Sequence, residues 1–265
     1  MSLSLEPEND HSINIANIYG KNKNNIFLND NGFDFDNIGD KKMGVKKIVL
    51  QDDRDFIFPL VNDHRNGTND RIFICGKSGC GKTYKFIRPY IKHFLSKYPS
   101  SKVYFFSSKL EDKAVDDLPI IRVKVDDKFV ESPPYIRLFT NKNKNPNLVV
   151  FDDVQDYKTN TINKAVQRLR DEILRNGRSL GLYIIYVWHK PADYKNTEIQ
   201  IFESTATVCF PKTSGHDDYD YMLKRYLGVS KDETKKILKN AKSNYVYITK
   251  KSPAVAISDK YILVL

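Results

Sequence analysis

Eight consecutive residues, from Gly76 to Thr83, match the pattern G-x-x-x-x-G-K-[ST] at every fixed position. A short apolar stretch, residues 71–75, comes directly before them, and residues 83–97 carry helical apolar spacing directly after them. A strand that turns through glycines into a helix lets several backbone N–H groups converge on one anion, and the helix N-terminus adds partial positive charge. The sequence therefore predicts a phosphate-binding loop, which consists of Gly76, Lys77, Ser78, Gly79, Cys80, Gly81, Lys82 and Thr83.

Two side chains of this loop have a defined chemical role in such sites. Lys82 is predicted to reach the β- and γ-phosphates of ATP, and the Thr83 hydroxyl is predicted to bind Mg²⁺. We expect Lys82 to stand in an exposed position with little packing around it.

An acidic pair follows a second apolar segment. Residues 148–151 are entirely apolar and are followed by Asp152 and Asp153. The carboxyl end of this strand is expected to lie beside the loop, so that Asp152 holds the magnesium ion through its water shell. Asp153 is the candidate that orients or deprotonates the attacking water, and Asp156 is the second candidate.

Three further residues are candidates for contacts with the nucleotide. Residues 182–187 form a predicted strand beside the loop strand, which places His189 near the γ-phosphate. Arg178, with Arg175 as second choice, is a candidate for the arginine that reaches the γ-phosphate of a neighbouring subunit, because a guanidinium is permanently charged and planar.

Apolar strands alternate with helical segments from about residue 45 to the end of the chain. This alternation predicts an α/β fold of the P-loop NTPase class, with a largely parallel central sheet flanked by helices. Three short strands, near residues 245–249, 254–257 and 261–265, are expected to finish it. Residues 1–44 are rich in asparagine and aspartate and predict a loosely structured arm, either disordered or ordered against a neighbouring subunit.

The charge balance indicates the kind of partner. The 265 residues carry a formal net charge of +10, which favours a polyanion such as nucleic acid. Three sparse cysteines predict no disulfide framework and a reducing, intracellular setting. No apolar run approaches the roughly 18 residues that span a bilayer, and the N-terminus does not resemble a signal peptide.

Taken in order, these segments resemble the poxvirus-type genome-packaging ATPases of large DNA viruses and virophages, within the FtsK–HerA superfamily. The resemblance covers roughly residues 46–265 and rests on residues 72–83, 148–154, 175–189 and 206–211. It implies a ring-shaped homo-oligomer that pumps double-stranded DNA into a capsid, with capsid proteins as partners. It also implies a location in the host cytoplasm or viral factory, or with the virion. The lysines that could contact DNA are Lys142, Lys144, Lys190 and Lys195.

Other functions remain open at the level of sequence. One is a helicase or another nucleic-acid remodelling ATPase of the same superfamily, and another is a nucleotide-dependent assembly switch. A small-molecule kinase would need a lid with clustered arginines, which we do not find. A GTPase would carry N-K-x-D, but Asn141-Lys142-Asn143 is followed by Lys144.

Overall fold

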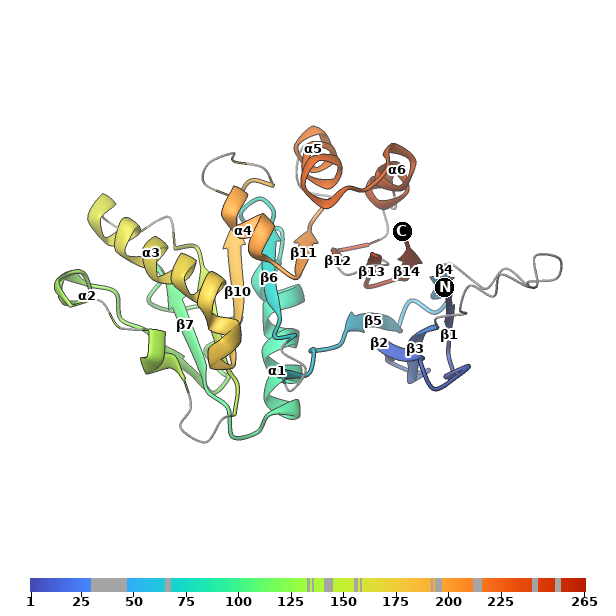
Figure 1. Cartoon of the computed structure of the whole chain (residues 1–265), viewed down its shortest axis with the longest axis horizontal. Helices are drawn as coiled ribbons and strands as arrows, with labels where there is room; N and C mark the ends of the chain where they lie inside the picture. Colours follow the sequence, from blue (N-terminus) through green and yellow to red (C-terminus); the bar gives the residue numbers. More distant parts are fainter. Residues whose placement is uncertain are drawn as a thin grey trace.

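A ten-stranded sheet covered by helices forms the body of the computed structural model, and a four-stranded sheet lies beside it (Figure 1). The structure describes residues 1–29, 47–64, 68–132, 134, 136–140, 145–154, 157, 159–191, 193, 197–211, 216–239, 243–250 and 254–265.

Six neighbouring strands of the larger sheet run parallel, in the order β11-β6-β10-β9-β7-β8. Their bounds are β6 Arg71–Cys75, β7 Val103–Ser107, β8 Ile120–Arg122, β9 Asn147–Asp152, β10 Leu182–Trp188 and β11 Ala206–Cys209. Every residue of β9, β10 and β11 is buried, as expected for parallel strands that are covered on both faces. The predicted α/β fold with a largely parallel sheet is confirmed.

The other side of the larger sheet is antiparallel. From β11 the order continues through β12, β13, β14 and β4. The bounds are β4 Lys47–Val49, β12 Val246–Thr249, β13 Val255–Ser258 and β14 Tyr261–Val264. The three short C-terminal strands expected from the sequence therefore extend the main sheet.

Helices cover the two faces of the parallel strands because side chains alternate along each strand. In β6, Ile72 and Ile74 pack into the core below a π-helical turn, η2 Thr83–Ile87, and α1 Arg88–Lys97. Phe73 and Cys75 point the other way, into the core below α3 Asn160–Asn176. The remaining helices are α2 Asp127–Glu131, η3 Ile136–Phe139, η4 Gly177–Leu180, α4 Glu198–Glu203, α5 His216–Leu227 and α6 Lys231–Lys239. Within the described ranges, no helix is both long and apolar enough to cross a membrane.

The N-terminal segment differs from its prediction. Its strands β1 Ser2–Ser4, β2 Ile13–Tyr19 and β3 Asn24–Asn29 pair with β5 Phe56–Pro59 in the order β1-β3-β2-β5. Ala16, Ile18 and Ile26 are buried in the same core as Ile72. The prediction of a loosely structured arm is wrong for residues 1–29. Apolar residues that look scattered in the sequence come together in a core when these strands pair. The proposed boundary at residue 44 lies outside the described residues.

Candidate nucleotide site

The loop that follows β6 has the backbone its glycines were expected to provide. Gly79 and Gly81 adopt positive φ angles of 76° and 94°, a region that side chains disfavour. A Cβ on Gly76 would lie 2.9 Å from the sulfur of Cys80 and 3.1 Å from Phe210, so only glycine fits there. The loop is therefore folded tightly against the end of β11.

Lys82 lies across this loop. Its ammonium donates hydrogen bonds to the carbonyl oxygens of Gly76 (2.7 Å) and Lys77 (3.0 Å). The residue is only 5% exposed, so the expectation of an exposed Lys82 with little packing is wrong. The loop encloses the aliphatic part of the Lys82 side chain, and two carbonyl oxygens of the loop accept hydrogen bonds from its ammonium group.

Asp152, the last residue of β9, meets Thr83 at the start of η2. The Thr83 hydroxyl donates a hydrogen bond to Asp152 Oδ2 at 2.9 Å. The other carboxylate oxygen, Oδ1, is buried and has no hydrogen-bond partner. Burial, and after it the neighbouring charge of Asp153, raise the pKa of Asp152 to about 6. A buried carboxylate with an unused oxygen beside a hydroxyl group is a donor set that fits Mg²⁺.

Asp153 lies next to this pair and is held from both sides. Its Oδ2 forms a 2.7 Å ion pair with Lys109 Nζ, and its Oδ1 lies 3.4 Å from His189 Nε2. The hydrogen bond to Asp153 raises the pKa of Lys109. The structure therefore brings Asp153 and His189 together, as residues that follow adjacent parallel strands.

Lys109 was missed from the sequence, although a signal for it existed. It comes two residues after β7, and the register pairs Ser107 of β7 with Asp152 of β9. Because parallel strands end at the same edge, a charged residue just beyond β7 lies beside the acidic pair.

His189 follows β10, which is adjacent to β6 as predicted. The carbonyl oxygen of Trp188 accepts a hydrogen bond from the Gly76 N–H at 3.2 Å, so the end of β10 is attached to the start of the loop. A contact of His189 with a γ-phosphate stays a prediction.

Tyr219 of α5 is a second residue that the sequence did not indicate. It is fully buried, donates from its hydroxyl to the Cys75 carbonyl oxygen (3.0 Å), and accepts from the Phe210 N–H (3.2 Å). These bonds join the ends of β6 and β11 directly below the loop.

The two candidate arginines lie at the opposite edge of the sheet. Arg178, in η4, and Arg175, in the last turn of α3, are exposed and precede the start of β10. Arg178 is close enough to Arg71, the first residue of β6, for its charge to lower the pKa of Arg71, which burial lowers most. Since β6 has five residues of about 3.3 Å each, roughly 15 Å separates Arg178 from the loop of its own chain.

Several other candidates cannot be placed. Asp156, Lys142, Lys144 and Lys195 lie outside the described residues, whereas Lys190 is exposed just after β10. Thus only Lys190 can be located among the lysines considered for DNA.

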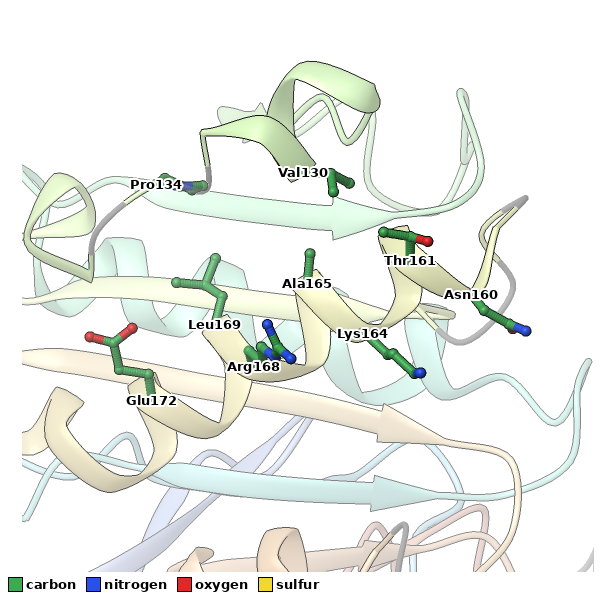
Figure 2. A pocket seen from close by; sticks show the side chains of 9 residues that line it. All are labelled: Val130, Pro134, Asn160, Thr161, Lys164, Ala165, Arg168, Leu169 and Glu172. Carbon is green, nitrogen blue, oxygen red and sulfur yellow. The ribbon is translucent and has the colours of Figure 1, made fainter.

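Figure 2 shows a groove of about 500 Å³ between α3 and the segment that carries α2. Its lining residues are Val130, Pro134, Asn160, Thr161, Lys164, Ala165, Arg168, Leu169 and Glu172. None of them belongs to the loop or to the acidic pair, so this groove is separate from the nucleotide site.

Comparison with known proteins gives one close match in sequence. The uncharacterized protein V3 of the Sputnik virophage is 31% identical over 184 residues, which are 69% of this chain and 71% of V3. No protein-family model matches the chain.

Two solved structures resemble parts of this chain at lower identity. The genome packaging NTPase B204 of Sulfolobus turreted icosahedral virus 2, with AMPPCP, is 15% identical at a TM-score of 0.49, over 72% of this chain and 97% of B204. The pCW3 conjugation coupling protein TcpA is 13% identical at a TM-score of 0.47, over 82% of this chain and 65% of TcpA.

Proposed function

This chain belongs to the protein family of V3 from the Sputnik virophage, and we propose that it is a magnesium-dependent ATPase that drives double-stranded DNA into a viral capsid. The observation that carries the ATPase proposal is the 2.9 Å bond between Thr83 and Asp152 beside the glycine loop. The unpaired Oδ1 of Asp152 supports a cation site at the same place.

The loop residues would bind the triphosphate. Backbone N–H groups of residues 76–83 surround the phosphates, and the Lys82 ammonium exchanges its two carbonyl partners for phosphate oxygens. Thr83 and Asp152 would hold Mg²⁺, which supplies charge neutralisation on the phosphates when it is bound.

Asp153 is the residue proposed to act on water. Its carboxylate orients a water molecule and accepts a proton as the water oxygen bonds to the γ-phosphorus. The bond between that phosphorus and the β–γ bridging oxygen breaks, and ADP and phosphate leave. His189, across from Asp153, is proposed to respond to the presence of the γ-phosphate.

Arg178 is proposed to complete the site of a neighbouring copy. Its position at the far edge of the sheet supports a role in another subunit, because it is too distant from the loop of its own chain. A head-to-tail contact of this kind closes into a ring when the rotation between copies permits it.

Double-stranded DNA is the proposed substrate of the motor. The net charge of +10 supports contact with phosphates without reading of sequence, and Lys190 is exposed at the edge that carries the nucleotide site. Capsid proteins are proposed partners, in the host cytoplasm or viral factory.

An ATPase assay with and without double-stranded DNA, run beside a mass measurement in solution, tests this function. We expect turnover that rises with DNA, a mass of several copies, and no turnover in Lys82→Ala. A folded Lys82→Ala protein with near-normal turnover would remove the nucleotide assignment. Binding of ATP without turnover would favour an assembly switch, and separation of duplex strands would favour a helicase.

A further inference from the structure

Both carboxylate oxygens of Asp153 are engaged by residues that follow the two strands flanking β9. Lys109, after β7, contacts Oδ2 at 2.7 Å, and His189, after β10, lies 3.4 Å from Oδ1. Asp153 itself is buried. Its orientation is therefore set by other parts of the chain and not by solvent.

The backbone of Asp153 is also constrained. Its φ angle of 54° is the one positive value at a non-glycine residue within the described part of the chain. A left-handed conformation costs roughly 1–2 kcal/mol at such a residue and persists only where surrounding contacts enforce it. The ion pair with Lys109 is the shortest contact recorded for this carboxylate, so it is the main candidate for that restraint.

Lys109 has a fixed backbone and an accessible side chain. Its carbonyl oxygen accepts a hydrogen bond from Arg122 at 3.1 Å, and its N–H donates to the Ser107 hydroxyl at 3.2 Å. The side chain is 51% exposed and borders a groove of about 690 Å³ that also includes Ser108 and Tyr157. The backbone of Lys109 is anchored, while the groove leaves room around its side chain.

We propose that Lys109 is a positioning residue for ATP hydrolysis: it holds Asp153 in the orientation from which that carboxylate directs the attacking water. The proposal rests on the proposed ATPase function. Lys109 acts through Asp153 and not by binding the nucleotide, because its ammonium is paired with the carboxylate and Lys82 is the lysine proposed for the phosphates. Loss of Lys109 leaves Asp153 with His189 alone and allows its backbone to relax.

The test compares Lys109→Met, which keeps the stem and removes the charge, with Lys109→Arg, which keeps a charged donor. We expect Lys109→Met to lower kcat by about 10²-fold, the size of effect that a misplaced catalytic group produces. The affinity for a non-hydrolysable ATP analogue should stay within about twofold, and Lys109→Arg should recover a large part of kcat. Lys113→Met is the matched control, since Lys113 is an exposed lysine of the same connection, and its kcat should equal that of the parent.

A double-mutant cycle separates positioning from other roles. In an Asp153→Ala background, Lys109→Met should cause no further loss of kcat, because the group through which it acts is absent. A further full loss in that background, a parallel loss of analogue affinity, or an unchanged kcat in Lys109→Met would each overturn the proposal. Thermal unfolding of every variant verifies that it is folded.

The experiments distinguish a failure of the inference about Lys109 from a failure of the proposed ATPase function. If Lys82→Ala abolishes turnover while Lys109→Met is normal, the ATPase stands and Lys109 is not a positioning residue. If folded Lys82→Ala retains normal turnover, the nucleotide site itself is wrong, and the inference about Lys109 falls with it.

Discussion

The two edges of the parallel sheet differ in the charged groups whose pKa burial shifts, a carboxylate at one edge and two cationic side chains at the other. At the carboxyl edge, Asp152 and Asp153 lie side by side, and burial raises the pKa of Asp152 to about 6. At the opposite edge, burial lowers the pKa of Arg71 and brings the pKa of Lys250 to about 8. Burial thus penalises a negative charge at the first edge and positive charges at the second.

This difference in charge indicates which ligand or partner each edge is suited to bind. At the carboxyl edge, the acidic pair with the unpaired Oδ1 of Asp152 is suited to bind a cation. Lys109 neutralises only part of the negative charge of this pair. At the other edge Arg71 has one carboxylate partner, Glu203 at 3.3 Å, while its Nε is buried without a hydrogen-bond partner. Arg178 adds a further positive charge there. Contact between unlike edges of two copies would bring Arg178 to a bound nucleotide, which supports the proposed ring.

The largest expected effect comes from Arg178→Ala. This variant should bind ATP nearly as well as the parent, because Arg178 lies far from the loop of its own chain. Its turnover should fall by about 10³–10⁵, the usual contribution of an arginine that stabilises the transition state from a neighbouring subunit. Steady-state turnover and analogue binding measure the two effects separately.

Mixing inactive variants tests whether the two edges meet. A subunit with Arg178→Ala keeps an intact loop, and a subunit with Lys82→Ala keeps an intact arginine. Partial recovery of turnover in mixed rings would support action between copies. A normal rate for Arg178→Ala alone would dismiss Arg178 and make Arg175 the next candidate.

Asp152→Asn, at the carboxyl edge, should weaken ATP turnover while it raises the free energy of unfolding. We expect Asp152→Asn to weaken Mg²⁺-dependent turnover more than ATP binding, because the loop N–H groups still hold the phosphates. The metal-free protein should become more stable by about 3 kcal/mol at pH 7, since a pKa raised from 3.8 to about 6 reports a cost of that order for the buried charge. Urea unfolding in EDTA measures the gain.

The pH dependence of this gain follows from the direction of the shift. The folded pKa of Asp152 is above the unfolded value, so the cost of its charge is full above about pH 6. It disappears as the pH falls toward 3.8, the ordinary pKa of an aspartate, where both states bind the proton. A gain of equal size at pH 7 and pH 4 would show that the charge of Asp152 is not its source.

The smallest expected effect is at the opposite edge. Lys250→Met should stabilise the protein by about 1 kcal/mol at pH 7, because burial in the folded state disfavours the charged form of Lys250. The folded pKa, near 8, is below the unfolded value, so the gain is full below pH 8 and declines toward pH 10.5. Thermal unfolding at pH 7 and pH 10 measures both, and a loss of stability at pH 7 would contradict the idea that burial penalises positive charge at this edge.

Local sequence was sufficient for the loop, Asp152 and most strands. The residues of the loop are consecutive, so their glycines and the helix after them define one local structure. The strand that became β6 has the predicted bounds, since a short apolar stretch that leads directly into glycines leaves little choice of element. Even here, the burial of Lys82 required the folded loop around it.

The tertiary structure alone decided which distant residues share the site. Lys109, Asp153 and His189 follow three different strands, and the contacts among their side chains appear only when β7, β9 and β10 pair. The same reason explains the N-terminal sheet, where pairing of β2 with β3 and β5 turns scattered apolar residues into a buried face. Strand pairing is a contact between segments far apart in the chain, so local pattern predicted the strands, whereas the pairing of β7 with β9 that places Lys109 beside Asp153 required the folded sheet.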